Sequence, residues 1–206
     1  MCGIYSLLNA LGYNNSKSLQ QLKSLFLKGI GRGPDNSKFI NYIDEFNALI
    51  GFHRLSINGI DTESNQPLII NNKLLICNGE IYNYKQLYSM YNITPKTHSD
   101  CEVIIHLYEL VGFENMIKML DGVFAFNLLD FSNSENLKFY VSRDPFGVRP
   151  LFIAKHNTNS SFGFTSIMKQ FDSDQFTLTQ FTPGTWCLYT QNPIINGTLW
   201  ILKKTH

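Results

Sequence analysis

Charge of either sign is scarce in this sequence. Seventeen Lys and Arg residues stand against sixteen Asp and Glu, so the net charge is +1 and only 16% of the 206 residues are charged. Nucleic acids and anionic membranes bind concentrated positive charge, so neither is expected as a partner. A hydrophobic content of 44%, with 14% aromatic residues, is enough for a buried core and excludes a disordered chain.

Cysteine is also scarce, and long apolar runs are missing. The four cysteines lie far apart with no C-x-x-C pair, so neither a zinc site nor a disulfide framework is expected: Cys2, Cys77, Cys101 and Cys187. No stretch approaches the ~20 apolar residues that span a membrane, and the start does not read as a signal peptide. We therefore expect a cytoplasmic protein with free thiols, without a metal or other cofactor.

Linkers, repeats and low-complexity tracts are absent, which predicts one domain over residues 2–206. Apolar runs bounded by turn residues predict strands at 2–8, 46–57, 73–83, 123–131, 137–144, 150–157, 161–166 and 184–190. Apolar residues at helical spacing predict helices within 16–31 and 99–120, the second with a stripe of Val103, Ile104, Leu107 and Leu110. Ser99 and Glu102 predict a capping box. The fold class is α+β, with two or more largely antiparallel β layers flanked by helices.

The chain begins Met1-Cys2-Gly3. If Met1 is removed, Cys2 carries a thiol and a free α-amine on one residue. Covalent hydrolysis of an amide needs a thiolate and a group that takes and returns a proton. An α-amine, with a reference pKa of about 7.7–8.0, is suited to that task. A lone early cysteine is more often structural, so this feature alone leaves both interpretations open.

Five further segments follow in order: "GRGPD" at 31–35, "HRLSI" at 53–57, "NGEIYN" at 78–83, "SDCEVI" at 99–104 and "RDPFGVRPL" at 143–151. Together with Met-Cys-Gly-Ile, they resemble the class II glutamine amidotransferase domain. Within that family the chain is most similar to the glutaminase half of glutamine-dependent asparagine synthetase. The resemblance extends from Cys2 to about residue 190.

The resemblance implies an N-terminal nucleophile hydrolase fold, an αββα sandwich of two largely antiparallel sheets flanked by helices. It also implies an enzyme that hydrolyses L-glutamine to L-glutamate and ammonia through a thioester on Cys2. Asn78 and Gly79 are then the oxyanion hole, with a side-chain amide and a backbone N–H as neutral donors. In isolation, the same dipeptide would be interpreted as an Asn-Gly turn between strands.

The resemblance further implies which residues recognise the amino-acid end of glutamine. The Arg54 guanidinium offers a bidentate fork to the α-carboxylate, and Asp100 with Glu80 receives the α-ammonium. The pocket behind Arg54 is lined mostly through backbone by Leu55, Ser56, Ile57 and Asn58. The competing interpretations are a surface arginine on a strand for Arg54 and a helix N-terminal carboxylate for Asp100.

Two turn-rich segments contain the remaining arginines of interest. We expect Arg32 and Arg143 to tie loops together through carboxylates such as Asp35 and Asp144, with organisation of the pocket as the second possibility. His53, a lone histidine on a strand, is expected to pack rather than act as a base. Two cysteines are expected to be small buried hydrophobes: Cys77 and Cys101.

The chain also departs from the synthetase pattern. The 206 residues contain no Ser-Gly-Gly-x-Asp-Ser loop, so the ATP-binding synthetase domain is expected to be absent and asparagine formation is not assigned to this chain. Ile167 stands where the family commonly has a glutamate. We therefore do not expect this chain to make the contacts that this glutamate ordinarily makes toward the synthetase half. Ammonia is expected to reach a separate protein, for asparagine synthesis or a related amidation. The alternatives are a catalytically weak glutamine-binding regulatory module and a truncated asparagine synthetase-like protein.

Overall fold

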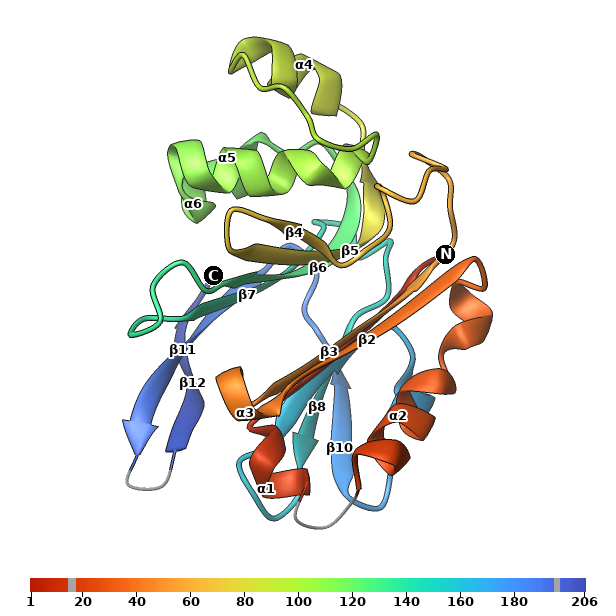
Figure 1. Ribbon diagram of the computed structural model, residues 1–206, viewed down its shortest axis with the longest axis vertical. Coiled ribbons are helices and arrows are strands. Elements are labelled where there is room, and N and C mark those ends of the chain that lie inside the picture. Colours follow the sequence, from red (N-terminus) through yellow and green to blue (C-terminus); the bar gives the residue numbers. More distant parts are fainter. Residues whose placement is uncertain (15–17, 195–196) are drawn as a thin grey trace.

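A computed structural model describes residues 1–14, 18–194 and 197–206 (Figure 1). Within them, strands pair antiparallel into two six-stranded sheets. The first sheet has the order β10-β8-β9-β1-β3-β2 and the second β12-β11-β7-β6-β5-β4. The first contains β1 (Gly3–Leu8), β2 (Asn36–Tyr42), β3 (Ala48–Arg54), β8 (Phe152–His156), β9 (Phe162–Thr165) and β10 (Phe176–Gln180). The second contains β4 (Leu68–Ile70), β5 (Lys73–Ile81), β6 (Gly122–Asp130), β7 (Lys138–Arg143), β11 (Trp186–Ile194) and β12 (Gly197–Thr205).

Helices cover the outer face of each sheet (Figure 1). One layer contains α1 (Ala10–Asn14) and α2 (Leu19–Leu27), with the short α3 (Ile43–Phe46) between β2 and β3. The other contains α4 (Tyr84–Met90), α5 (Val103–Val111) and α6 (Phe113–Met119). Three 3₁₀ turns complete the described elements: η1 (Ile30–Arg32), η2 (Asp100–Glu102) and η3 (Met168–Gln170). The predicted αββα sandwich is confirmed.

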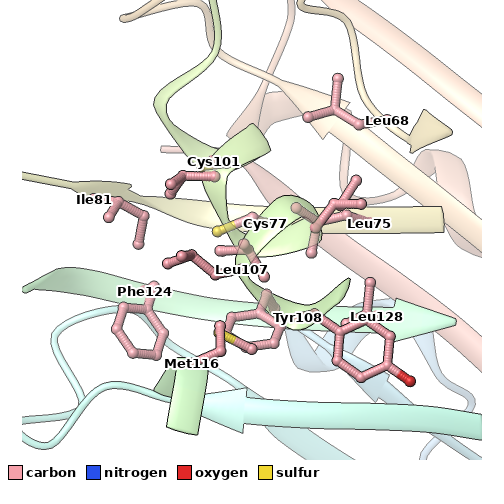
Figure 2. Close-up of a cluster of buried hydrophobic side chains, with 14 of the residues drawn as sticks. Leu68, Leu75, Cys77, Ile81, Cys101, Leu107, Tyr108, Met116, Phe124 and Leu128 are labelled. Atoms are coloured by element: carbon pink, nitrogen blue, oxygen red, sulfur yellow. The ribbon is translucent and has the colours of Figure 1, made fainter. Parts of the chain in front are cut away.

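The apolar core forms three layers, because both faces of each sheet are covered. In β1, Ile4 and Leu8 point into the layer between the sheets, whereas Tyr5 joins the layer under α2. In β5 the same alternation sends Ile76 between the sheets and Cys77 toward α5 (Figure 2). A strand buried on both faces reads as a continuous apolar run, and this explains why these strands were predictable.

The helix predictions are right in part. The first helix begins at the N-cap Ser18, whose hydroxyl and Gln21 form a reciprocal capping box; residues 16 and 17 of the predicted range lie outside the described residues. The second is broken at Gly112, where φ is +75°, into α5 and α6. The prediction that Leu110 belongs to the apolar stripe of this helix is wrong, because this residue is 56% exposed.

The capping box predicted at Ser99 and Glu102 is also wrong. Ser99 makes no side-chain capping bond. Glu102 is fully buried and accepts hydrogen bonds from the backbone N–H groups of Lys96 and Thr97. It also pairs with His106 at 2.8 Å. The carboxylate therefore fixes the segment before the helix instead of closing the cap.

In the described part of the chain, no helix is both long and apolar enough to cross a membrane. The N-terminal end of β1 lies beside the C-terminal end of β3, since Gly3 pairs with His53 (Figure 1). Segments from β5 and η2 reach the same end of the sandwich and form one cavity there with residues 1–2, which precede β1, and with the end of β3. The topology thus brings segments that are far apart in the sequence, such as those of Cys2, Arg54, Asn78 and Asp100, to one place.

Candidate active site

A small cavity, of about 30 Å³, opens at this end of the sandwich. It is lined by Met1, Cys2, Arg54, Leu55, Ile57, Asn58, Ser64, Gln66, Cys77, Asn78, Gly79, Glu80, Ser99, Asp100, Cys101 and Arg149. Every residue predicted for the site is among them except Ser56. The backbone N–H of Ser56 instead donates to Asp35 Oδ2 at 2.7 Å, which fixes the turn after β3.

Cys2 precedes β1 and is half-buried at the wall of the cavity. Its Sγ donates to the carbonyl oxygen of Leu55 and accepts from the Leu55 N–H, both at 3.4 Å. Burial raises the pKa of the Cys2 thiol, and the hydrogen bond to the Leu55 backbone opposes that shift. The thiol is therefore mainly protonated near neutral pH, and it needs a base before it can attack an amide.

Arg32 contacts the backbone of Cys2. Its Nε donates to the Cys2 carbonyl oxygen at 2.9 Å. The prediction that Arg32 pairs with the Asp35 carboxylate is therefore wrong. Burial lowers the pKa of Arg32, and the nearby Cys2 opposes that shift. Close packing requires glycine at the neighbouring position 33, because a Cβ on Gly33 would lie 2.4 Å from the backbone of His53. The "GRGPD" segment therefore packs directly against the end of β3.

Asn78 and Gly79 lie within β5, paired with Ala125 and Phe124 of β6, and not in a turn. Asn78 is 1% exposed, and its side-chain Nδ2 has no hydrogen-bond partner among the described residues. An unpaired buried donor costs about 1–3 kcal/mol. A Cβ on Gly79 would lie 2.4 Å from the carbonyl oxygen of Val123. The cavity thus contains a buried amide donor beside a strand segment that only glycine fits.

Arg54 is 5% exposed, which excludes a surface arginine. Its Nη1 donates to the Asp61 carbonyl oxygen at 3.0 Å and to Asn65 Oδ1 at 2.7 Å. Its Nη2 donates to the carbonyl oxygens of Asn58, at 3.2 Å, and Gly59. The guanidinium therefore closes the loop that follows β3 upon itself, at the edge of the cavity.

Asp100 and Glu80 supply two carboxylates to the cavity. Asp100 is 4% exposed, and its Oδ2 accepts from the Ile81 N–H at 2.7 Å. Burial raises the pKa of Asp100, and the hydrogen bond from Ile81 opposes that shift. Glu80 Oε1 lies 3.1 Å from Nη2 of Arg149. Asp100 starts a 3₁₀ turn of three residues, so it is a helix N-terminal carboxylate as well as part of the cavity wall.

Sequence reasoning missed several lining residues, of which Arg149 is the most polar. Arg149 belongs to "RDPFGVRPL", and its buried Nε has no partner among the described residues. Arg143 ties this segment together as predicted, but through carbonyl oxygens: those of Gly147, Arg149 and Phe181. Asp144 accepts from the backbone N–H groups of Phe124, Phe146, Val148 and Arg149. The sequence feature that could have predicted Arg149 as a site residue is its position in the motif at 143–151.

Three packing predictions are confirmed. His53 stacks on Phe26 with ring centroids 4.0 Å apart, and its Nε2 lies 2.9 Å from the Phe26 carbonyl oxygen. Its Nδ1 lies 2.7 Å from the Ser37 hydroxyl, so both ring nitrogens are satisfied. Cys77 and Cys101 are buried at 1% and 2% exposure, and both pack in the layer under α5 (Figure 2).

The two-sheet sandwich is shared with solved structures. Glutamine phosphoribosylpyrophosphate amidotransferase from B. subtilis, complexed with ADP and GMP, matches 98% of this chain and 49% of its own. The TM-score is 0.72 at 21% identity. The allosteric regulatory enzyme of purine biosynthesis matches equally well, with a TM-score of 0.72, 20% identity and the same coverage. These similarities define the fold, that of the N-terminal nucleophile hydrolases.

Residues 1–191 match the family described as "Glutamine amidotransferase domain", and the chain belongs to this family. Human asparagine synthetase (glutamine-hydrolysing) is 42% identical over 158 residues, which cover 75% of this chain and 26% of the relative. The probable asparagine synthetase of Acanthamoeba polyphaga mimivirus is 35% identical over 187 residues, covering 89% and 33%. The chain therefore spans about a quarter to a third of the length of these relatives, and its class is that of the class II amidotransferases.

Proposed function

We propose that this chain hydrolyses L-glutamine to L-glutamate and ammonia at the cavity beside Cys2. The observation that carries the proposal is the unpaired, buried Nδ2 of Asn78 in the same cavity as a half-buried thiol. A fold tolerates an unsatisfied donor when a ligand group completes it. An oxyanion formed next to the thiol is such a group.

The chemistry begins with removal of Met1, which frees the α-amine of Cys2. The amine takes the thiol proton, and the sulfur attacks the side-chain amide carbon of glutamine. Negative charge on the carbonyl oxygen is stabilised by Asn78 and by the backbone N–H of Gly79. The protonated amine then gives its proton to the departing nitrogen. The C–N bond breaks, ammonia is released, and a γ-glutamyl thioester of Cys2 is formed. Water hydrolyses this thioester to glutamate and restores the Cys2 thiol.

Charged and polar groups around the cavity support recognition of the α-amino acid. Arg54 neutralises the α-carboxylate through Nη2, in exchange for its bonds to the carbonyl oxygens of Asn58 and Gly59, while Nη1 keeps its bond to Asp61. Asp100 receives the α-ammonium, and Glu80 contributes from its pair with Arg149. The pocket behind Arg54 is formed by the segment after β3: Leu55, Ser56, Ile57 and Asn58. Of these, Ser56 does not line the cavity; its N–H bond to Asp35 holds the segment in place.

Residues 2–206 act as one amidotransferase domain in this proposal, in the cytoplasm, where free thiols persist. The ammonia serves asparagine synthesis or a related amidation carried out by a separate synthetase domain. The similarity to glutamine-hydrolysing asparagine synthetases supports this partner. The near-neutral charge supports a small-molecule substrate and a protein partner over nucleic acid or membrane.

The test measures glutamate and ammonia release from L-glutamine by the purified chain. Mass spectrometry establishes whether Met1 is removed, and Cys2→Ala serves as the matched inactive control. We expect wild-type turnover and none in Cys2→Ala, with an unchanged thermal melt. Glutamine binding without hydrolysis in the Met1-free wild type would refute the enzyme and support the regulatory module instead.

A further inference from the structure

Two neighbouring loops form adjacent walls of the cavity. The loop 57–65, between β3 and β4, contributes Ile57, Asn58 and Ser64 to the lining. The segment 96–100, which leads from α4 into the first residue of η2, contributes Ser99 and Asp100. In the proposed function, the first loop surrounds Arg54 and the second contains Asp100. The distance between these walls therefore sets the space for the α-amino-acid end of the substrate.

One residue of each loop joins the walls on the outside of the cavity. His98 Nδ1 lies 2.8 Å from Asp61 Oδ2, and the His98 N–H donates to Ser64 Oγ at 3.2 Å. The second oxygen of Asp61, Oδ1, accepts from the Ser64 N–H at 2.8 Å. Asp61 thus holds its own loop in shape with one oxygen and holds the neighbouring loop with the other.

Asp61 also connects this contact to Arg54. Its backbone carbonyl oxygen accepts from Arg54 Nη1 at 3.0 Å. His98, in turn, lies two residues before Asp100. Burial raises the pKa of Asp100, and the nearby Asn58 side chain is among the groups that oppose this shift, so the loop also faces Asp100. Arg54 and Asp100 are therefore coupled through a short path that runs over Asp61 and His98.

The packing between the loops leaves little slack. Gly59 has a φ of +60°, and a Cβ there would lie 2.3 Å from Ser64 Oγ and 2.9 Å from the backbone carbon of His98. Hydrogen bonds from Ser64 and His98 lower the pKa of Asp61 to about 2, so its carboxylate is charged at any ordinary assay pH. The contact between the Asp61 carboxylate and the His98 imidazole is placed where a change of its length moves one wall against the other.

We propose that the Asp61–His98 pair is a positioning pair for substrate recognition, which holds Arg54 and Asp100 at the spacing that fits an α-amino acid. The inference rests on the proposed glutaminase function and names two residues outside its catalytic and binding groups. The His98 side chain is 83% exposed and that of Asp61 29%, and exposed pairs contribute modestly. The expected effect is therefore a rise in KM of about three- to fivefold, with kcat nearly unchanged.

The variants are chosen to remove the pair without removing its framework. Asp61→Asn keeps an oxygen for the Ser64 N–H and removes the charge, and His98→Gln keeps a polar side chain. The matched control is Glu114→Gln, which breaks an exposed ion pair with Lys204 that lies outside the cavity lining. The charge-reversed double variant Asp61→Lys/His98→Glu places a cation and a carboxylate at the exchanged positions, but it lacks the acceptor for the Ser64 N–H, so only part of the contact returns.

The experiment measures kcat and KM for L-glutamine in these variants, with calorimetric Kd for L-glutamine in the Cys2→Ala background and thermal melts as folding controls. We expect a three- to fivefold rise in KM and Kd in each single variant, no larger rise in the double Asp61→Asn/His98→Gln, no change in Glu114→Gln, and partial recovery in the charge-reversed variant. An unchanged KM in folded Asp61→Asn, or additive effects in the double variant, refutes the pair while glutamine hydrolysis by the wild type stands. A wild type that neither hydrolyses nor, as Cys2→Ala, binds glutamine refutes the proposed function itself, and with it this inference.

Discussion

Nε of Arg32 donates a hydrogen bond to the carbonyl oxygen of Cys2 at 2.9 Å. The contact crosses 30 residues and fixes the peptide that follows the candidate nucleophile. Nη2 of the same guanidinium is buried without a partner among the described residues. Arg32 therefore helps to organise the cavity, which is the second of the two roles that the sequence suggests for this residue.

Replacing Arg32 by alanine should lower kcat/KM for glutamine by about 10- to 100-fold, because a hydrogen bond that involves a charged group contributes about 1.5–3 kcal/mol. The loss should fall mainly on kcat, since the bond positions the nucleophile. Steady-state kinetics with a thermal melt checks this. An Arg32→Ala protein with wild-type kcat would assign the residue to loop packing alone.

The pH dependence of the reaction should reveal the base. Burial raises the pKa of the Cys2 thiol, so the thiol does not ionise by itself near neutral pH. Activity then requires the unprotonated α-amine, whose reference pKa is about 7.7–8.0. We expect kcat/KM to rise from about pH 6 to about pH 8.5 and to be lost as the pH falls through the amine pKa. Protein that retains Met1, identified by mass spectrometry, should be inactive at every pH; activity in that form would exclude the amine as base.

Asn78→Ala should lower kcat by ~10²–10³ with a smaller effect on KM, because the amide serves the charge that develops during reaction. Since Nδ2 is already unpaired in the free protein, the substitution should not destabilise the fold by loss of a donor partner. Kinetics and denaturation together test both parts. A fall in stability with unchanged kcat would make Asn78 a packing residue of β5.

Asp100→Asn should separate binding from stability. A carboxyl whose folded pKa is raised contributes stability below its unfolded pKa, and that contribution is lost as the pH rises through the folded value. Burial raises the pKa of Asp100, so at neutral pH the ionised group opposes folding. The neutral amide keeps an oxygen for the Ile81 N–H, and we expect Tm at about pH 7.5 to rise by on the order of 2 °C while KM for glutamine rises about tenfold or more. The Tm difference should shrink as the pH falls through the raised pKa of Asp100 and level off below the unfolded value of about 3.9; a difference that is independent of pH would contradict the electrostatic cause.

The strands that the sequence predicted are the inner ones. The four that it missed, β2, β4, β10 and β12, are the edges of the two sheets. Inner strands are covered on both faces and read as apolar runs, whereas an edge strand such as β2, with the sequence NSKFINY, is half exposed and reads as a loop. The order of strands in the sheets was not predictable from the pattern, because pairing is a long-range property.

The candidate site was predictable to the extent that its residues stand in motifs. Cys2, Asn78 and Asp100 come from three such segments, and the fold brings them to one cavity. Asp61 and His98 were out of reach, since they stand in no motif and meet only because two loops pack together. The spacing from Ser99 predicts a cap for Glu102, but burial against the preceding loop gives this carboxylate other partners.

Glutamine hydrolysis by the 206-residue chain should need no ATP. The sequence has no Ser-Gly-Gly-x-Asp-Ser loop to hold a nucleotide, and the groups proposed for the chemistry all lie in the one cavity. Ammonia should therefore form from glutamine at the same rate with and without ATP and aspartate, and no asparagine should form. We expect a low basal rate that rises when a separate synthetase domain is added, because an ammonia acceptor that docks near the cavity can stabilise the ordered form of its loops. An amino-acid assay of the isolated chain, with each substrate omitted in turn, tests this. Asparagine made from aspartate and ATP by this chain alone would contradict the proposal, whereas ammonia release that depends on ATP would show that a nucleotide site exists outside the motif.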